Sequence, residues 1–154
     1  MHFASLYFVV FTTVVGALAE SHTVHFENRC GFGTPMLIQG PKVLSHGEDF
    51  TSSGPLTAAI AYLNNGSCGF NGDGCTLVEL TLKNPDPTAP GSGSSADISL
   101  IPPLAFSQPA GFVYFNGCDG AGTNCDNVNC PNAFRNPDDT FVQVACQTND
   151  VRIC

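Results

Sequence analysis

Two carboxylates in the middle of the chain have the residue type and the strand position that sugar chemistry requires. Glu79 lies inside the run Leu77 to Leu82, and Asp97 opens the run Asp97-Ile98-Ser99-Leu100. Successive side chains of a strand point to opposite faces, so Val78, Leu80 and Leu82 share one face of the first run and Glu79 lies on the other. In the second run, Ile98 and Leu100 lie opposite Asp97 in the same way. The sequence therefore predicts that both carboxylates point out of the core, if the apolar faces point into it.

Such a pair of carboxyl groups suits either glycan binding or glycan hydrolysis. Hydrolysis needs one protonated acid and one ionised carboxylate, about 5–5.5 Å apart for retention of configuration or about 6.5–9.5 Å apart for inversion. Binding needs only hydrogen bonds to sugar hydroxyls and an aromatic ring against a sugar face. Tyr62, Tyr114 and Phe115 are the candidate rings, and the chain has no Trp. No G-x-S-x-G nucleophile motif competes with these interpretations.

Short strands must position these residues. Apolar runs with period-two alternation are separated by Gly, Pro, Asn and Asp clusters, which predicts an all-β sandwich or barrel of short antiparallel strands. A helical turn remains an alternative at residues 58–63, where Ala and Leu favour helix. Residues 84–96, rich in Pro, Gly and Ser, are expected to form a flexible exposed loop. The predicted strands are residues 23–27, 35–38, 56–63, 77–82, 98–101, 112–115 and 141–144.

The N-terminal segment predicts secretion. Residues 1–19 resemble a cleavable signal peptide, with an apolar core from Leu6 to Val15 and a cleavage-like triplet at Ala17-Leu18-Ala19. Residues 20–154 then form a single domain. We expect a secreted, extracellular or cell-wall-associated monomer with no membrane span after signal cleavage.

All eight cysteines follow this segment, and an even number in a secreted chain predicts four disulfides. Their spacing fits no zinc template, so we expect neither a metal site nor a cofactor. The sequon Asn65-Gly66-Ser67 makes Asn65 a candidate glycosylation site.

The formal net charge of −8 argues against nucleic acid as a partner, because phosphate binding needs clustered Lys and Arg and the chain has only five such residues. The acidity has two open explanations, solubility of the folded domain or an acidic functional site.

The last quarter of the chain contains an ordered frame of cysteines and acidic residues. Its elements are Cys118, Cys125, Cys130-Pro131-Asn132-Ala133-Phe134, Asp138-Asp139, Cys146 and Cys154. This frame resembles the end of a thaumatin-like protein. It carries, in the order found in that family, the cysteines, a C-P-x-A-F segment and an acidic pair. Nearer the N-terminus, Asn28-Arg29-Cys30-Gly31 and Asp97-Ile98-Ser99-Leu100 are similar to further family segments, so the resemblance covers most of residues 22–154.

The resemblance implies a disulfide pairing that spacing alone could not select among the many connectivities of eight cysteines. The bridge between the first and last cysteine would close nearly the whole mature chain, which the chain-entropy model values at about 4–5 kcal/mol. Only Asp126-Asn127-Val128-Asn129 stands where full-length relatives insert a disulfide-rich subdomain. We therefore expect a small, disulfide-stabilised thaumatin-like β-sandwich with an open acidic face. The implied pairs are Cys30–Cys154, Cys68–Cys75, Cys118–Cys146 and Cys125–Cys130.

The resemblance also implies a function. The acidic cleft of the family is described by one arginine and four acids, of which Glu79 and Asp97 match two acids and Asp138-Asp139 the region of a third, while Ala58-Ala59-Ile60-Ala61 replaces the arginine. Glu79, Asp97 and Asp139 are the catalytic candidates, and Asp138 joins them as a binding candidate.

The expected function is binding of a cell-wall β-glucan-type polysaccharide, with a defence, antifungal or effector role. Two alternatives stay open. One is a weak endo-β-1,3-glucanase that uses the paired carboxylates, and the other is a structural or stress-secreted protein without carbohydrate activity.

Overall fold

The computed structural model describes residues 20–147 and 150–154. The predicted signal segment, residues 1–19, lies outside the described residues. Within them every regular element is a β-strand, and no helix is long and apolar enough to cross a membrane.

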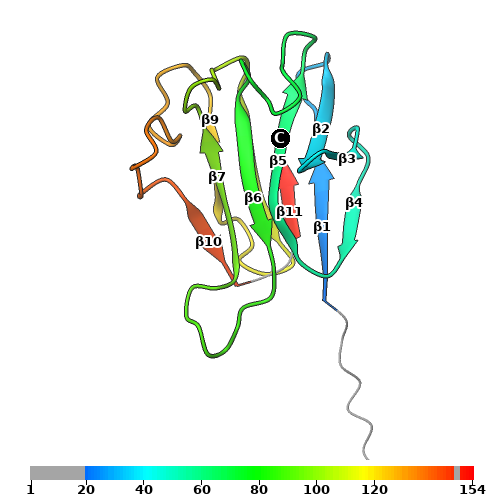
Figure 1. Cartoon of the computed structure of the whole chain (residues 1–154), viewed down its shortest axis with the longest axis vertical. Coiled ribbons are helices and arrows are strands. Elements are labelled where there is room, and N and C mark those ends of the chain that lie inside the picture. The colour runs from blue at the N-terminus through cyan, green and yellow to red at the C-terminus, as the bar shows by residue number, and fades with distance from the viewer. Residues whose placement is uncertain (1–19, 148–149) are drawn as a thin grey trace, which may run out of the picture.

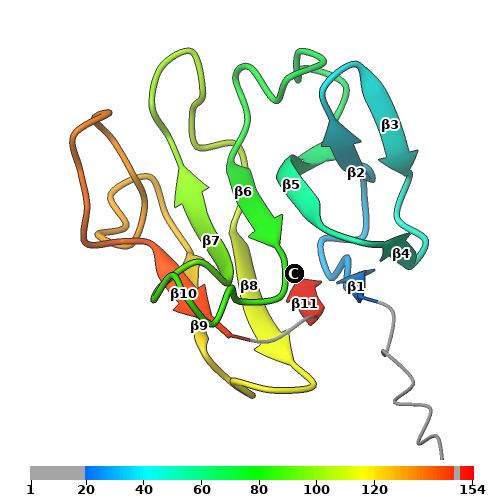
Figure 2. The ribbon, with the colours of Figure 1, turned by 60° about the horizontal axis from the view of Figure 1, so that its bottom comes forward.

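In the described part of the chain, eleven strands form two sheets, which confirms the predicted all-β, disulfide-stabilised sandwich (Figures 1 and 2). All pairs of these strands are antiparallel except β1 (Ser21–Phe26) with β11 (Asp150–Ile153), which run in the same direction. The five-stranded sheet has the order β4 (Phe50–Ser53), β1 (Ser21–Phe26), β11 (Asp150–Ile153), β8 (Ala110–Phe115) and β9 (Gly122–Cys125). The six-stranded sheet has the order β10 (Val144–Cys146), β7 (Ser94–Ser99), β6 (Leu77–Leu82), β5 (Leu56–Asn64), β2 (Thr34–Gln39) and β3 (Lys42–Ser45).

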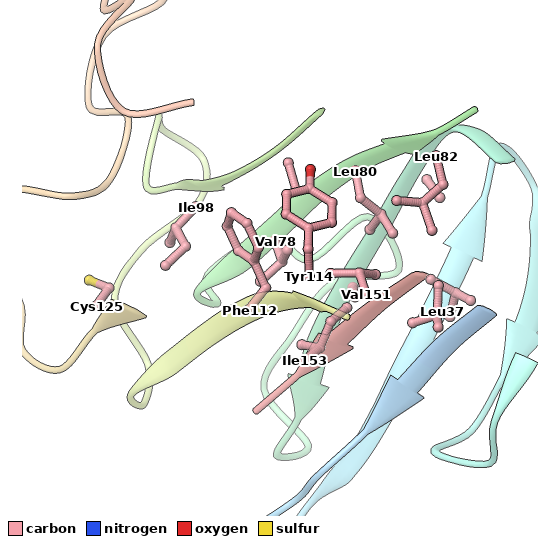
Figure 3. Packing of buried hydrophobic residues seen from close by; sticks show 14 of the residues in the cluster. Leu37, Val78, Leu80, Leu82, Ile98, Phe112, Tyr114, Cys125, Val151 and Ile153 are labelled. Atoms are coloured by element: carbon pink, nitrogen blue, oxygen red, sulfur yellow. The ribbon is translucent and has the colours of Figure 1, made fainter. Parts of the chain in front are cut away.

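The main hydrophobic core lies between the sheets. Val78, Leu80 and Leu82 project into it from β6, as their alternation predicts, and Phe112 and Tyr114 enter it from β8 (Figure 3). The two aromatic rings meet edge to face, with centroids 6.0 Å apart. Burial of large apolar side chains from both sheets is the main force that holds the sandwich together.

A second, smaller cluster covers part of the outer face of the six-stranded sheet. It contains Met36, Ile38, Tyr62 and Leu77, with Ile60 packed against it. Leu77 shares its face of β6 with Glu79 and Thr81, because side chains two apart lie on the same side. The outer face is therefore apolar where Leu77 lies and becomes polar farther along β6.

The structure corrects the predicted boundaries of one loop and one strand, and it decides between strand and helical turn at residues 58–63. Residues 58–63 belong to β5, so the helical turn is absent. The exposed loop covers residues 84–91, whereas Ser94 to Ala96, predicted as its end, belong to β7. There the Ser94 hydroxyl accepts a hydrogen bond from the Lys83 backbone N–H at 3.0 Å, which draws the end of the loop into the sheet. The strand predicted at 141–144 begins only at Val144.

Three of the four predicted disulfides are present, Cys68–Cys75, Cys118–Cys146 and Cys125–Cys130. The fourth prediction is wrong for this structure, because Cys30 and Cys154 are both free. The β1–β11 register places Ile153 opposite Phe26, and the Cys154 thiol contacts Glu27 Oε2 at 3.6 Å. Cys30 lies farther along, in a turn where its N–H donates to Asn28 Oδ1. Both cysteines nevertheless line the same cavity of about 40 Å³.

Candidate functional site

Glu79 and Asp97 face each other across two strands. They are direct partners in the antiparallel register of β6 and β7, both on the outer face of the six-stranded sheet. The Cβ atoms of such partners lie about 4.5–5.5 Å apart, so the two side chains interact. Strand alternation predicted their shared orientation, and the register brings them together.

The two carboxyl groups differ in exposure. Glu79 is exposed, whereas Asp97 is only 7% exposed and its Oδ1 atom is buried without a hydrogen-bond partner. Burial raises the pKa of Asp97 to about 7, and the negative charge of Glu79 and a side-chain hydrogen bond with it act in the same direction. A hydrogen bond with Gln143 opposes these effects on the pKa. Asp97 thus keeps its proton well above the pH at which an ordinary aspartate loses it.

A pocket of about 170 Å³ opens beside this pair. Its polar side chains include Thr81, Ser95 and Gln143 in addition to the two carboxylic acids, and its remaining lining is apolar. No Lys, Arg or His lines it. The site is therefore an acidic hollow in the outer face of the sheet, with no basic side chain in its lining to compensate the charge.

Gln143 joins the site from a distant part of the chain. Val144 of β10 pairs with Ala96 of β7, so the residue before Val144 comes opposite Asp97. The sequence alone did not indicate this residue. A polar side chain just before a short edge strand carries no signal until the pairing of that strand is known.

A β-bulge shapes the opposite wall of the pocket. The register between β5 and β6 shifts between Leu56 and Ala59, and Ala58 adopts a left-handed φ of 50°. Its backbone N–H donates to Thr81 Oγ1 at 3.0 Å in place of a ladder bond. Bulges of this kind are over-represented beside functional sites, where they redirect side chains.

We expect Ala58→Gly to stabilise the protein by up to about 1 kcal/mol, although glycine normally weakens a strand. Glycine adopts a left-handed φ without the Cβ clash that alanine suffers there, and exposed Ala58 gives up no core packing. Chemical denaturation checks the sign. Ala145→Gly, at an exposed β10 position that has no positive φ, is the control and should destabilise. Destabilisation of equal size by both changes would contradict the expectation.

The other acidic candidates do not reach the pocket. Asp139 Oδ2 accepts hydrogen bonds from the backbone N–H groups of Arg135 and Asn136, which hold the pKa of Asp139 below its usual range. This carboxylate stabilises a turn. Asp138 is exposed, and neither residue lines the hollow beside Glu79.

The two tyrosines predicted as sugar-stacking rings are buried. The Tyr62 hydroxyl donates to the Phe70 carbonyl at 2.8 Å, and the Tyr114 hydroxyl donates to the Val144 carbonyl at 3.0 Å. Tyr62 is 5% exposed and Tyr114 is fully buried, so neither presents a face to a ligand. This prediction is wrong because a tyrosine with a partner for its hydroxyl packs as a core residue. By contrast, Asn65 is exposed, in a turn closed by its own side chain with Ser67.

Two comparisons, with family models and with curated proteins, give no match. A function must therefore be inferred from the residues and geometry described above.

Proposed function

We propose that the chain is a small thaumatin-like protein that binds a cell-wall β-glucan-type polysaccharide through the hollow at Glu79 and Asp97. One observation carries the proposal, the buried and unpartnered Oδ1 of Asp97 beside an exposed carboxylate. A buried acceptor without a donor is costly, and a sugar hydroxyl supplies the missing donor. The three disulfides and the acidic surface fit a secreted, wall-associated monomer with a defence, antifungal or effector role.

The geometry favours binding over hydrolysis. The two carboxyl groups belong to direct cross-strand partners on one sheet face, whereas a hydrolase holds its two groups on either side of the scissile bond, at least about 5 Å apart. The pocket of about 170 Å³ is also smaller than the roughly 300–1,000 Å³ of typical ligand clefts. It suits one hydroxyl-bearing edge of a sugar on an otherwise open surface.

One observation supports the second candidate, a weak endo-β-1,3-glucanase. The pKa of about 7 at Asp97 is the property that a general acid needs, and Glu79 would be the ionised partner. Turnover would require the two side chains to separate around a glycosidic oxygen.

A combined binding and activity assay tests the proposal. The purified protein is incubated with insoluble and soluble β-1,3-glucan, and pull-down and release of reducing sugar are scored separately. We expect binding without release, weakened about tenfold or more by Glu79→Gln or Asp97→Asn, because leaving a buried donor or acceptor without its partner costs about 1–3 kcal/mol.

Asp138→Asn is the matched control, since it removes an exposed carboxylate outside the hollow and should leave binding unchanged. Sugar release that both site substitutions abolish would favour the glucanase. If the wild-type protein neither binds nor cleaves glucan, the proposal fails and the acidic face is a solvated surface of a structural or stress-secreted protein.

A further inference from the structure

The charge of the Glu79–Asp97 pair has no basic partner in its pocket. The lining combines two carboxylic acids with hydroxyl, amide and apolar groups, and it includes no Lys, Arg or His. At Ile60, directly opposite Glu79 on β5, the side chain is apolar as well. Once Asp97 has lost its proton, the two adjacent carboxylates in this partly desolvated hollow repel each other and attract an external positive charge.

The buried acceptor atom Oδ1 of Asp97 is an independent indication that this hollow binds a ligand. Asp97 is more than nine-tenths buried, it lines the pocket, and its Oδ1 has no hydrogen-bond partner. Buried polar atoms are nearly always satisfied by protein, water or an ion, so an exception calls for an explanation. The volume of about 170 Å³ has room for an ion together with water molecules, each of which occupies about 30 Å³ in the liquid.

We propose that this hollow binds a divalent cation, Ca²⁺, through the carboxylates of Glu79 and Asp97 and the amide oxygen of Gln143. The hydroxyl-bearing residues Thr81 and Ser95 line the same pocket. All of these ligands are hard oxygen donors, which Ca²⁺ prefers.

The chemistry of the donors selects among metals. Zn²⁺ favours nitrogen and sulfur, and no His or Cys lines the pocket. Mg²⁺ demands a near-ideal octahedron, whereas Ca²⁺ accepts six to eight oxygens in flexible geometry and completes its shell with water.

The low number of charged ligands makes the site weak. No group of three His, Cys, Asp or Glu residues that could hold a metal occurs in the part of the chain that the structure describes. Two carboxylates with neutral oxygens correspond to the weakest class of calcium sites, with a Kd of about 0.1–1 mM. Such a site is occupied only where Ca²⁺ is abundant.

The proposed cation site uses the same side chains as the proposed glycan site, but Ca²⁺ binding does not depend on glycan binding. Water positions on a bound Ca²⁺ are open to exchange with sugar hydroxyls, so the two ligands can share the hollow. Metal binding is therefore measured without glycan.

Calorimetric titration of the purified chain with CaCl₂ tests the inference. We expect a single site with a Kd of about 0.1–1 mM, and at least tenfold weaker binding in Asp97→Asn and in Glu79→Gln. Asp138→Asn should bind as the wild type does. Absence of saturable binding by the wild type up to about 10 mM Ca²⁺, or equal binding by wild type and Asp97→Asn, would overturn the inference.

A second pair of variants tests the cation site without changing either carboxylate. Ile60→Arg places a guanidinium directly across the strand pair from Glu79 and should abolish Ca²⁺ binding, whereas uncharged Ile60→Gln should retain it. Circular dichroism establishes that both variants are folded. Loss of binding in both variants, or in neither, would count against an electrostatic site at this position.

The outcome is separable from that of the proposed function. Glucan pull-down that persists in EDTA, together with the absence of saturable Ca²⁺ binding in calorimetry, overturns the cation site and leaves glycan binding intact. Ca²⁺ binding without any glucan retention supports the cation site and overturns the proposed function.

Discussion

Asp97→Asn is expected to be more stable than the wild-type protein at about pH 8 and similar to it at about pH 4. The pKa of Asp97 rises from an ordinary 3.8 to about 7 on folding, so the folded state binds the proton more tightly than the unfolded state. This contribution to stability is complete below about pH 4 and is lost as the pH rises through about 7. At about 1.4 kcal/mol per pH unit, the full loss is about 4 kcal/mol.

Asparagine has no such dependence, because it stays neutral while its amide can still donate to Glu79. Urea unfolding of both proteins at several pH values in EDTA gives the difference directly, and the chelator removes any contribution from Ca²⁺. Asp138→Asn is the control for loss of a carboxylate on the open surface. Wild-type and Asp97→Asn stabilities that change in parallel with pH would show that burial and Glu79 do not hold the proton on Asp97.

Strand alternation is a local property, which is why the sequence predicts the faces of the strands correctly. Val78 and Leu80 enter the core while Glu79 points away from it, and Ile98 and Asp97 divide in the same manner on β7. Hydrophobic burial selects one face of each strand, and a shift of one residue would reverse every side chain.

The composition of the site depends on contacts that no local pattern encodes. Gln143 reaches Asp97 only because β10 adds to the edge of β7, and the bulge at Ala58 arises from the pairing of β5 with β6. The burial of Asp97 is likewise a result of tertiary packing. The sequence could suggest two outward carboxylates, but it could not indicate which of them would be desolvated.

The predictions for the tyrosines and for the first and last cysteines are wrong for a related reason. Tyrosine has an apolar body and a polar tip, so its type fits a binding surface and a core equally well. A partner for the hydroxyl decides between them, and Val144 provides it for Tyr114. For Cys30 and Cys154, resemblance suggested a bridge, but the described geometry leaves both thiols free.

Tyr114→Ala should destabilise the protein by about 3–5 kcal/mol, the largest loss that we expect from a single side chain here. The ring is fully buried between the two sheets, packs edge to face against Phe112 and belongs to the same core cluster as Val78 and Leu80 (Figure 3). Truncation loses the transfer free energy of the ring and leaves a cavity that the sandwich can only partly close. Against a typical total of about 5–15 kcal/mol, this loss brings the domain close to unfolding.

Tyr114→Phe separates the ring from its hydroxyl. It keeps the packing but leaves the Val144 carbonyl without its donor, for which we expect a cost of about 1–3 kcal/mol. Phe141→Ala removes an aromatic ring that is 80% exposed and should change stability by less than about 0.5 kcal/mol. In denaturant titration we expect Tyr114→Ala to be the least stable of the three variants, Tyr114→Phe to be intermediate and Phe141→Ala to be the most stable. A Tyr114→Ala protein as stable as Phe141→Ala would mean that the two sheets do not pack on this ring.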